Sequence, residues 1–169
     1  MFAAGRRAES EFESFVEAEG ESLRRFAVFL TGDPDEGADL AQEALARAYR
    51  HWGRIKSGEP GPYVRGILVN LVRSAHRRSL VRRRHEKAHV PELVVAAESG
   101  RVNDWIVMRE ALQRLRPVVR ASIVLRFYED MPLEEIARVL DRPLGTVKSD
   151  LHRGMAQLRR YLTAERKQA

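Results

Sequence analysis

The sequence predicts an all-α protein of two small helical domains, residues 11–84 and 105–163, joined by a flexible linker over 85–104. Three observations predict this class. Apolar residues recur at every third or fourth position along most of the chain, which is the period of a helix that buries one face. No segment shows a convincing alternation of apolar and polar residues, the pattern of a half-buried strand. The helical period is lost at the linker and then returns, as expected for two separate domains.

The first domain is expected to contain three helices. A first helix covers about 11–31. Asp33 is the expected N-cap of a second helix over about 34–52, which has a proline in its first turn. Glycine and proline residues break the pattern over 53–62, so we expect a loop there and a third helix over about 63–84.

The linker contains Pro91 and Gly100 and mixes charges without a sustained apolar stripe. The helical pattern returns at Trp105, and Pro117 marks the start of a further helix. The stretch 133–153 then predicts two helices connected by a tight turn. We therefore expect the second domain to be helical throughout.

Charge is distributed unevenly along the chain. The 169 residues include 30 Lys or Arg and 24 Asp or Glu, which gives a formal net charge of +6. Residues 1–52 hold six basic and eleven acidic side chains, whereas residues 65–87 hold eight and one, and residues 141–169 hold seven and three. The small overall excess therefore hides two basic blocks, one in each domain.

The composition excludes several classes of function. The chain has no cysteine, which excludes disulfide scaffolds, thiolate zinc sites and thiol nucleophiles. Its five histidines are scattered, without the spacing of a metal site or a catalytic group, so we expect no catalytic residue, metal site or cofactor. No apolar run reaches the roughly 20 residues that span a bilayer, and the N-terminus lacks the apolar stretch of a signal peptide. We therefore expect a cytoplasmic protein with no membrane insertion.

The stretch 133–153 has the pattern of a helix-turn-helix. Ala137 is small enough to let the second helix cross the first closely. The turn and the outward face of the second helix carry donors of the kind that reach phosphates and base edges in a major groove. An amphipathic hairpin with a solvated polar face is the alternative, although the short turn and the basic second helix favour DNA binding. The inward apolar residues are Ile136, Leu140, Val147 and Leu151, and the outward polar residues are Arg142, Thr146, Lys148, Ser149, His152 and Arg153.

Two faces of the first domain carry polar groups at helical spacing. Asp39, Gln42 and Glu43 lie near one face of the second helix, where the spacing alone also fits a solvated acidic surface. On the third helix several polar residues lie largely off the stripe expected to be buried. For Asn70 the alternative is a buried amide that packs between helices. The polar residues of this third helix are Arg65, Asn70, Arg73, Arg77 and Arg78.

Several motifs together resemble the extracytoplasmic-function sigma factors of bacterial RNA polymerase, most closely the actinobacterial SigE-type branch. The resemblance covers about residues 11–163. It implies a transcription initiation factor that binds core polymerase, recognises promoter DNA and assists its melting, and that is not an enzyme. The motifs are Phe127-Tyr128-Glu129-Asp130, Glu135-Ile136-Ala137 and Gly145-Thr146-Val147-Lys148-Ser149 in the second domain, and Asp39-Leu40-Ala41-Gln42-Glu43 and Ile67-Leu68-Val69-Asn70 in the first.

The resemblance also implies roles for individual residues. Asp39, Gln42 and Glu43 would dock on the clamp of the largest polymerase subunit. The five polar residues of the third helix would bind the −10 promoter element, and the loop over 53–61 would form a pocket for an unstacked base. The six outward residues of the helix-turn-helix would bind the −35 element. An anti-sigma protein, which in this family often covers such faces, is a further candidate partner.

One residue departs from the family pattern. The residue after Ser149 is often basic in relatives, whereas here it is Asp150. A carboxylate in a groove lined by phosphates must either accept a hydrogen bond from a cytosine amino group or point away. A second function also stays open: a helix-turn-helix regulator that acts without polymerase, which would usually dimerise to read paired half-sites and would need no acidic docking face.

Overall fold

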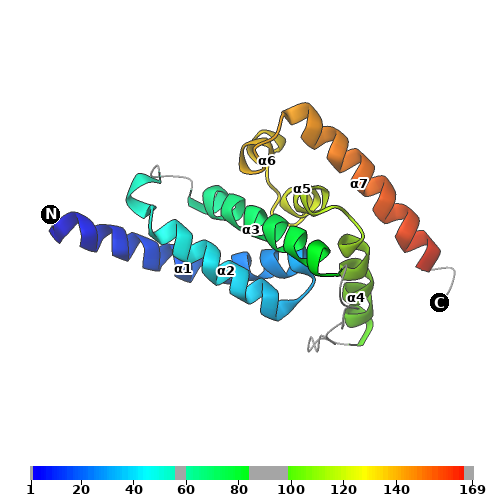
Figure 1. Ribbon diagram of the computed structural model, residues 1–169, viewed down its shortest axis with the longest axis horizontal. Helices are drawn as coiled ribbons and strands as arrows, with labels where there is room; N and C mark the ends of the chain where they lie inside the picture. Colours follow the sequence, from blue (N-terminus) through cyan, green and yellow to red (C-terminus); the bar gives the residue numbers. More distant parts are fainter. Residues whose placement is uncertain (1, 56–59, 84–98, 166–169) are drawn as a thin grey trace.

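The computed structural model describes residues 2–55, 60–83 and 99–165, and within these ranges every regular element is helical (Figure 1). This confirms the all-α class. No helix among the described residues is long and apolar enough to cross a membrane. The elements are α1 (Phe2–Thr31), α2 (Pro34–Tyr49), the 3-10 turn η1 (Trp52–Arg54), α3 (Pro60–Arg83), α4 (Ser99–Gln113), α5 (Pro117–Phe127), α6 (Leu133–Val139) and α7 (Leu144–Glu165).

All three helices of the N-terminal part differ in extent from the prediction, and α3 begins at Pro60, inside the expected loop over 53–62, because proline is well tolerated in the first turn of a helix. α1 begins at Phe2 and not near residue 11, because residues 3–11 are mostly Ala, Arg and Glu, which are good helix formers. Arg7 also pairs with Glu11 one turn later, at 2.9 Å. α2 ends at Tyr49, earlier than predicted, and the chain continues as η1.

The expected linker lies mostly outside the described residues, which resume at residue 99. Residues 99–104, predicted as part of the linker, form the first turns of α4 instead. After Gly100 no glycine or proline interrupts the chain before Pro117. The helix can therefore begin before the first residue of the regular apolar pattern.

In the N-terminal unit (α1–α3), α1 and α2 form a hairpin, and α3 packs against both (Figure 1). Asp33 caps α2 as predicted, because its Oδ1 accepts hydrogen bonds from the backbone N–H groups of Asp35 and Glu36, both at 2.9 Å. α1 and α2 approach closely at Gly37, where a Cβ would lie 3.0 Å from the backbone nitrogen of Val28. The cap and the close approach together fix how α2 lies on α1.

In the C-terminal unit (α4–α7), α5 is the central helix, and residues 119–125 are all buried. α7 crosses it at Gly154, where a Cβ would lie 2.6 Å from Cγ1 of Val119 and 2.7 Å from Cδ1 of Ile123. Such distances are shorter than van der Waals contact, so only glycine lets the two helices come this close. This crossing holds α7 against the body of the unit.

The two units pack directly against each other, with α1 and α3 of one against α4, α5 and α6 of the other. Arg120 of α5 is 4% exposed and donates hydrogen bonds to the carbonyl oxygens of Leu112 at the end of α4, of Leu115 in the α4–α5 connection and of Leu30 in the last turn of α1. Gln113 donates to the carbonyl oxygen of Phe29 at 3.3 Å. Side chains of the C-terminal unit thus donate hydrogen bonds to carbonyl oxygens at the end of α1. Burial lowers the pKa of Arg120 to about 10, so the side chain stays protonated at neutral pH.

Candidate nucleic-acid interface

The C-terminal unit presents the outward face predicted for the helix-turn-helix. The four apolar residues expected to face inward are all buried, which confirms that part of the prediction. α6 is followed by Asp141, whose left-handed backbone conformation (φ 49°) turns the chain toward α7. The exposed polar residues of this face are Lys148, Ser149, His152 and Arg153, and the half-buried ones are Arg142 and Thr146.

Asp150 does not belong to that outward face. Its side chain is 1% exposed and accepts hydrogen bonds from Arg142 (2.5 Å) and Arg153 (3.1 Å), two of the predicted −35 residues. Of the two orientations open to this carboxylate, the structure therefore shows the one that points away from the outer surface. Contact of the surrounding residues with a −35 element stays a prediction.

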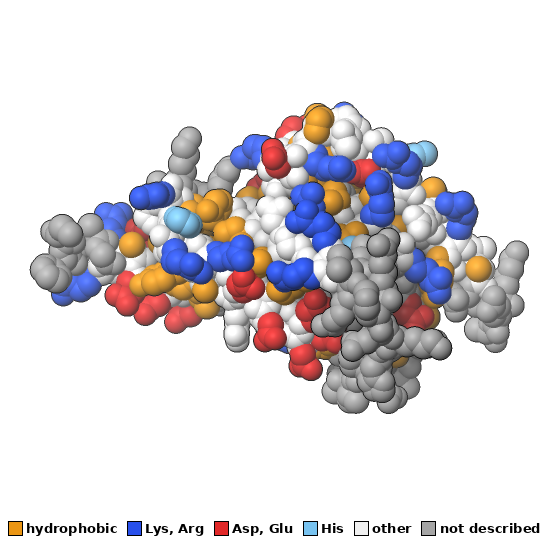
Figure 2. All heavy atoms as spheres, viewed as in Figure 1, with side chains coloured by type: hydrophobic (Ala, Val, Ile, Leu, Met, Phe, Trp, Pro, Cys, Tyr) orange, Lys and Arg blue, Asp and Glu red, His pale blue; other side chains and the backbone are white. Residues whose placement is uncertain are grey.

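The N-terminal unit presents a second polar face along α3. Asn70, Arg73, Arg77 and Arg78 are exposed, as predicted. Nη1 of Arg73 donates a hydrogen bond to Oδ1 of Asn70 at 3.3 Å. The alternative for Asn70, a buried packing amide, is therefore wrong. Figure 2 shows Lys and Arg side chains spread over α3 and the C-terminal unit, whereas acidic side chains gather along the lower edge, over α1 and α2.

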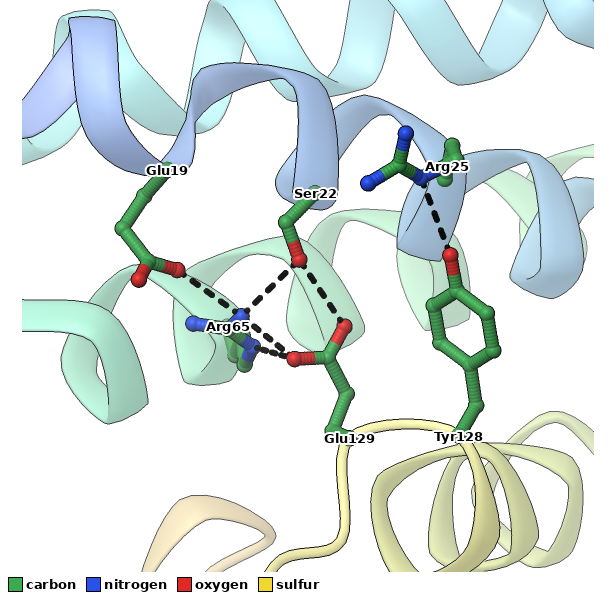
Figure 3. A network of polar contacts seen from close by, with 6 residues as sticks. All are labelled: Glu19, Ser22, Arg25, Arg65, Tyr128 and Glu129. Atoms are coloured by element: carbon green, nitrogen blue, oxygen red, sulfur yellow. Dashed lines mark hydrogen bonds and ion pairs between the residues drawn. The ribbon is translucent and has the colours of Figure 1, made fainter.

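Arg65 is the exception on α3, and the expectation that it lies off the buried stripe is wrong (Figure 3). Its side chain is 7% exposed and forms an ion pair with Glu129, which follows α5 in the C-terminal unit and is itself 9% exposed. Glu19 (3.1 Å) and Ser22 (3.3 Å) of α1 complete its contacts. We call these four residues the clasp. Arg65 joins the two units here because α3 meets the end of α5 at this point.

A cleft of about 440 Å³ opens between α3 and α6. Asn70 of the α3 face lines it, so part of the predicted −10 surface faces the C-terminal unit in this arrangement. The predicted base pocket in the loop over 53–61 includes residues 56–59, which lie outside the described residues. The N-terminal unit lines the cleft with Ile55, Pro62, Tyr63, Gly66, Ile67 and Asn70, and the C-terminal unit with Glu135, Arg138, Val139 and Asp141.

The predicted polymerase-binding residues Asp39, Gln42 and Glu43 are all exposed on α2. The helix buries its other face against the N-terminal core. Glu43 forms an ion pair with Arg47 one turn later, at 2.5 Å, and both side chains are about half exposed. The three residues therefore share an accessible surface, and their docking role stays a prediction.

Sequence reasoning missed the charged residues that connect distant elements. Arg120, Glu129 and Arg116 all find partners far away in the sequence or in another helix. Spacing within one helix carries no signal for such pairs. The one available sign was Arg120 itself, the one charged residue of the mostly apolar stretch 118–125. Among the described residues, no group of three or more His, Asp or Glu side chains is placed to hold a metal ion.

Comparison with known proteins assigns a family to each unit. The Sigma-70 region 2 family matches residues 15–82, and the Sigma-70, region 4 family matches residues 106–158. The RNA polymerase sigma-E factor of Streptomyces coelicolor is 35% identical over 155 residues, which cover 91% of this chain and 87% of that protein. The ECF RNA polymerase sigma factor SigL of Mycobacterium tuberculosis is 32% identical over 143 residues, 81% of this chain and 80% of that protein.

A solved structure shares the fold. The sigma factor RpoE of Bartonella quintana, solved as a co-crystal with the anti-sigma factor NepR, aligns with a TM-score of 0.78 and 22% identity over 90% of this chain and 97% of that one. A helix-turn-helix regulator that acts without polymerase is not favoured, because the N-terminal unit matches region 2. The resemblance seen in the motifs is confirmed. The chain belongs to the extracytoplasmic-function (ECF) family of RNA polymerase sigma factors.

Proposed function

We propose that this sigma factor recognises promoters with two separate faces, the exposed residues of α3 on the −10 element and the turn and outward face of α7 on the −35 element. One observation carries the proposal: each of the two family-matched units presents an outward surface rich in arginine or amide groups. Guanidinium and amide groups are the side chains that pair with phosphates and base edges. Binding and positioning of DNA needs no catalytic group, metal ion or cofactor, so we expect no enzymatic activity.

The exposed acidic surface of α2 is the proposed docking site for the largest subunit of core polymerase. α2 lines neither of the proposed DNA faces nor the cleft between α3 and α6. The surface that carries Asp39, Gln42 and Glu43 can therefore meet a protein while both DNA faces meet the promoter. This division of labour places polymerase and −10 binding in residues 11–84 and −35 binding in residues 105–163.

Simultaneous contact with both elements requires the two units to separate. The names of the elements place them about 25 base pairs apart, which is about 85 Å along B-form DNA at 3.4 Å per base pair. In the structure α3 touches α6, since a Cβ on Gly66 would lie 3.2 Å from the carbonyl oxygen of Val139. Asn70 and the turn residue Asp141 line the same cleft. We infer that the arrangement described here is a closed form and that promoter binding uses an open one.

Reconstitution with core RNA polymerase tests the proposal. The protein is added to core enzyme and a library of genomic promoter fragments, and the transcripts are sequenced. We expect transcripts from a subset of fragments that share one sequence near −35 and another near −10. Failure to bind core enzyme would overturn the proposal, and so would transcripts that share no upstream sequence.

The docking surface has its own test. Asp39→Ala combined with Gln42→Ala should weaken binding to core polymerase by about tenfold or more, because hot-spot residues of an interface cost about 2 kcal/mol or more when truncated. At saturating core enzyme the same variant should select the same promoters. Glu17→Ala, which removes one exposed carboxylate from α1, is the matched control. An equal loss of core binding in the control would show that only the general negative charge matters.

We also propose an anti-sigma protein as a third partner, and a cytoplasmic location beside the polymerase. The support for this partner is the Bartonella sigma factor of the same fold, which was solved in complex with one. Purification of the tagged protein from its native cells should recover a protein that inhibits the reconstituted transcription reaction. A partner that leaves transcription unchanged would not support this role.

A further inference from the structure

Asp150 lies at the centre of three arginines that come from three different segments, one helix and two connections. Its Oδ2 accepts a hydrogen bond from Arg142, in the turn before α7, at 2.5 Å, and its Oδ1 accepts one from Arg153 of α7, at 3.1 Å. Arg116, which precedes α5, reaches Oδ1 at 3.9 Å. The carboxylate is 1% exposed, whereas the three arginine side chains are 35% to 75% exposed. A buried carboxylate therefore gathers three guanidinium groups at the surface.

This cluster has excess positive charge and further hydrogen-bond donors that can bind another anion. Three positive charges and one negative charge leave +2. Each guanidinium has five N–H donors, and the carboxylate uses few of them. The remaining donors lie beside the N-terminal half of α7, on the proposed −35 face. Phosphate oxygens and the edge of guanine are the acceptors that such donors fit.

The carboxylate also fixes the geometry of its partners. A free arginine side chain samples many rotamers, and it loses this freedom when it binds DNA. The bonds to Asp150 hold Arg142 and Arg153 in one relative position before DNA arrives, and Oγ of Ser149 lies 3.5 Å from Nη2 of Arg153. A preorganised pair binds well only to bases that match its geometry, which favours specificity.

We propose that Asp150 is a positioning residue for −35 recognition, which orients Arg142 and Arg153, and that Arg116 is a further DNA-binding residue of the same surface. This inference rests on the proposed −35 role of α7. Arg116 lies at 3.9 Å from the carboxylate and is 75% exposed. Its guanidinium is therefore held by electrostatic attraction more than by a hydrogen bond of fixed geometry. Such a group is suited to a phosphate and not to a particular base.

A promoter library tests the positioning role. Holoenzymes made from core RNA polymerase and wild-type, Asp150→Asn or Asp141→Asn protein select templates with a randomised −35 element and a fixed −10 element. Asp141→Asn is the matched control, because it also removes one carboxylate near α7, and asparagine tolerates the left-handed backbone at that position. We expect Asp150→Asn to lower discrimination at one or two −35 positions by about tenfold, and the control to stay within about twofold of wild type.

The relative preference for each base distinguishes a positioning role of Asp150 from a loss of folded protein. A variant that is only partly folded would select fewer templates of every kind and keep the wild-type preferences. That result would overturn the proposal, and so would failure of the Asp150→Asn protein to fold. Wild-type protein that selects no −35 sequence would instead contradict the proposed function itself, before any variant is compared.

A second arm tests whether Asp150 acts through its partners. In a protein that already carries Arg142→Ala and Arg153→Ala, the added Asp150→Asn change should alter the base preferences no further. A further change in that background would show that the carboxylate acts by another route, and would overturn the positioning role.

Arg116→Ala tests the third arginine. Because a phosphate contact carries no base information, we expect weaker holoenzyme binding to all −35 sequences about equally, and a plot of log K against log salt shallower by about one. Arg24→Ala, which removes an exposed arginine of α1, is the control and should change neither quantity. An unchanged salt dependence in Arg116→Ala would remove Arg116 from the site.

Discussion

The two proposed DNA faces differ in what surrounds the helix that carries them. α7 packs mainly on α4, α5 and α6, all within its own unit, and its outward residues are exposed. α3 packs on α1 and α2 of its own unit and also on α5 and α6 of the other. As a result the proposed −35 face is complete within one unit, whereas the proposed −10 face has one predicted residue, Arg65, bonded to the other unit and another, Asn70, lining the cleft.

The two faces therefore depend differently on how the two units are arranged. The α7 face depends on packing within its own unit. The accessible part of the α3 face changes when the units come together or separate. Variants at the contact between the units should therefore affect the α3 face most. Variants inside the C-terminal unit should affect the packing that holds α7 without separating the two units.

Arg120→Ala is expected to have the largest effect, because it breaks the contact between the end of α1 and the C-terminal unit. The change removes the side-chain donor from several buried carbonyl oxygens, including those of Leu30 and Leu115, whereas that of Leu112 keeps its bond from the backbone N–H of Leu115. Each such group costs about 1–3 kcal/mol, and relief of the desolvation of the buried guanidinium offsets part of the total. We expect the free energy of unfolding to fall by about 3 kcal/mol in urea denaturation.

Arg116→Ala serves as the control for that stability measurement. Arg116 is 75% exposed, so its loss should change the free energy of unfolding by no more than about 0.5 kcal/mol. A loss below about 1 kcal/mol in Arg120→Ala would mean that desolvation of the guanidinium nearly cancels the hydrogen bonds that it makes.

Glu129→Gln is expected to loosen the clasp. Among the described residues, Arg65 would keep only Glu19, which is 40% exposed, as a charged partner. Loss of one partner of a buried pair costs about 3–5 kcal/mol, and the remaining carboxylate reduces this to about 2 kcal/mol for the closed form. The chain has no cysteine, so dyes can be attached at Ala46→Cys on α2 and Ala156→Cys on α7. We expect lower energy transfer between the dyes.

The matched control for the clasp is Glu134→Gln, which removes an exposed carboxylate from α6. Energy transfer in this variant should equal that of the wild type. If Glu129→Gln also leaves the transfer unchanged, the clasp does not hold the units together, and the contrast between the two DNA faces would have another cause.

Gly154→Ala probes the support of α7. In most helices this change stabilises by up to about 1 kcal/mol, but here the added Cβ would lie 2.6 Å from the stiff side chain of Val119. We expect a loss of about 1–2 kcal/mol in thermal or urea unfolding, with the clasp intact. At Gly145 in the same helix, the new Cβ would have no heavy atom within 4 Å apart from its chain neighbours and its own helix backbone, so Gly145→Ala should be neutral or stabilising. The same sign in both variants would contradict the close crossing.

Asp141→Gly should have the smallest effect, and it should be stabilising. The residue has φ 49°, a conformation that costs a residue with a Cβ about 1 kcal/mol and glycine very little. We expect a gain of up to about 1 kcal/mol in the free energy of unfolding. Asp141→Ala, which lacks the local hydrogen bonding of an aspartate, should be destabilising. A gain in the alanine variant would show that the backbone conformation is not the cause.

Much of the fold and of the α7 face could be predicted from the sequence, because both depend on contacts within short stretches. The N-cap at Asp33 and the inward residues of the helix-turn-helix follow from spacing, and the structure confirms them. The exposed position of Asn70 follows from the same rule.

The partners of Arg65 and Asp150 could not be predicted in this way. Arg65 meets Glu129 at a separation of 64 residues, across two domains. Asp150 meets Arg116 only because α5 and α7 pack together. Helical spacing identifies the faces of a helix, whereas these pairs depend on which distant element covers each face.

At Gly66, the addition of a single methyl group would affect how closely the two units pack. Within α3, alanine would favour the helix over glycine by about 1 kcal/mol. Between the units, the same methyl group would press on the carbonyl oxygen of Val139 at 3.2 Å. A change of one codon can thus strengthen one domain and weaken its contact with the other. Natural variation at this position can tune the balance between the proposed closed and open forms while every charged residue and both proposed DNA faces stay the same.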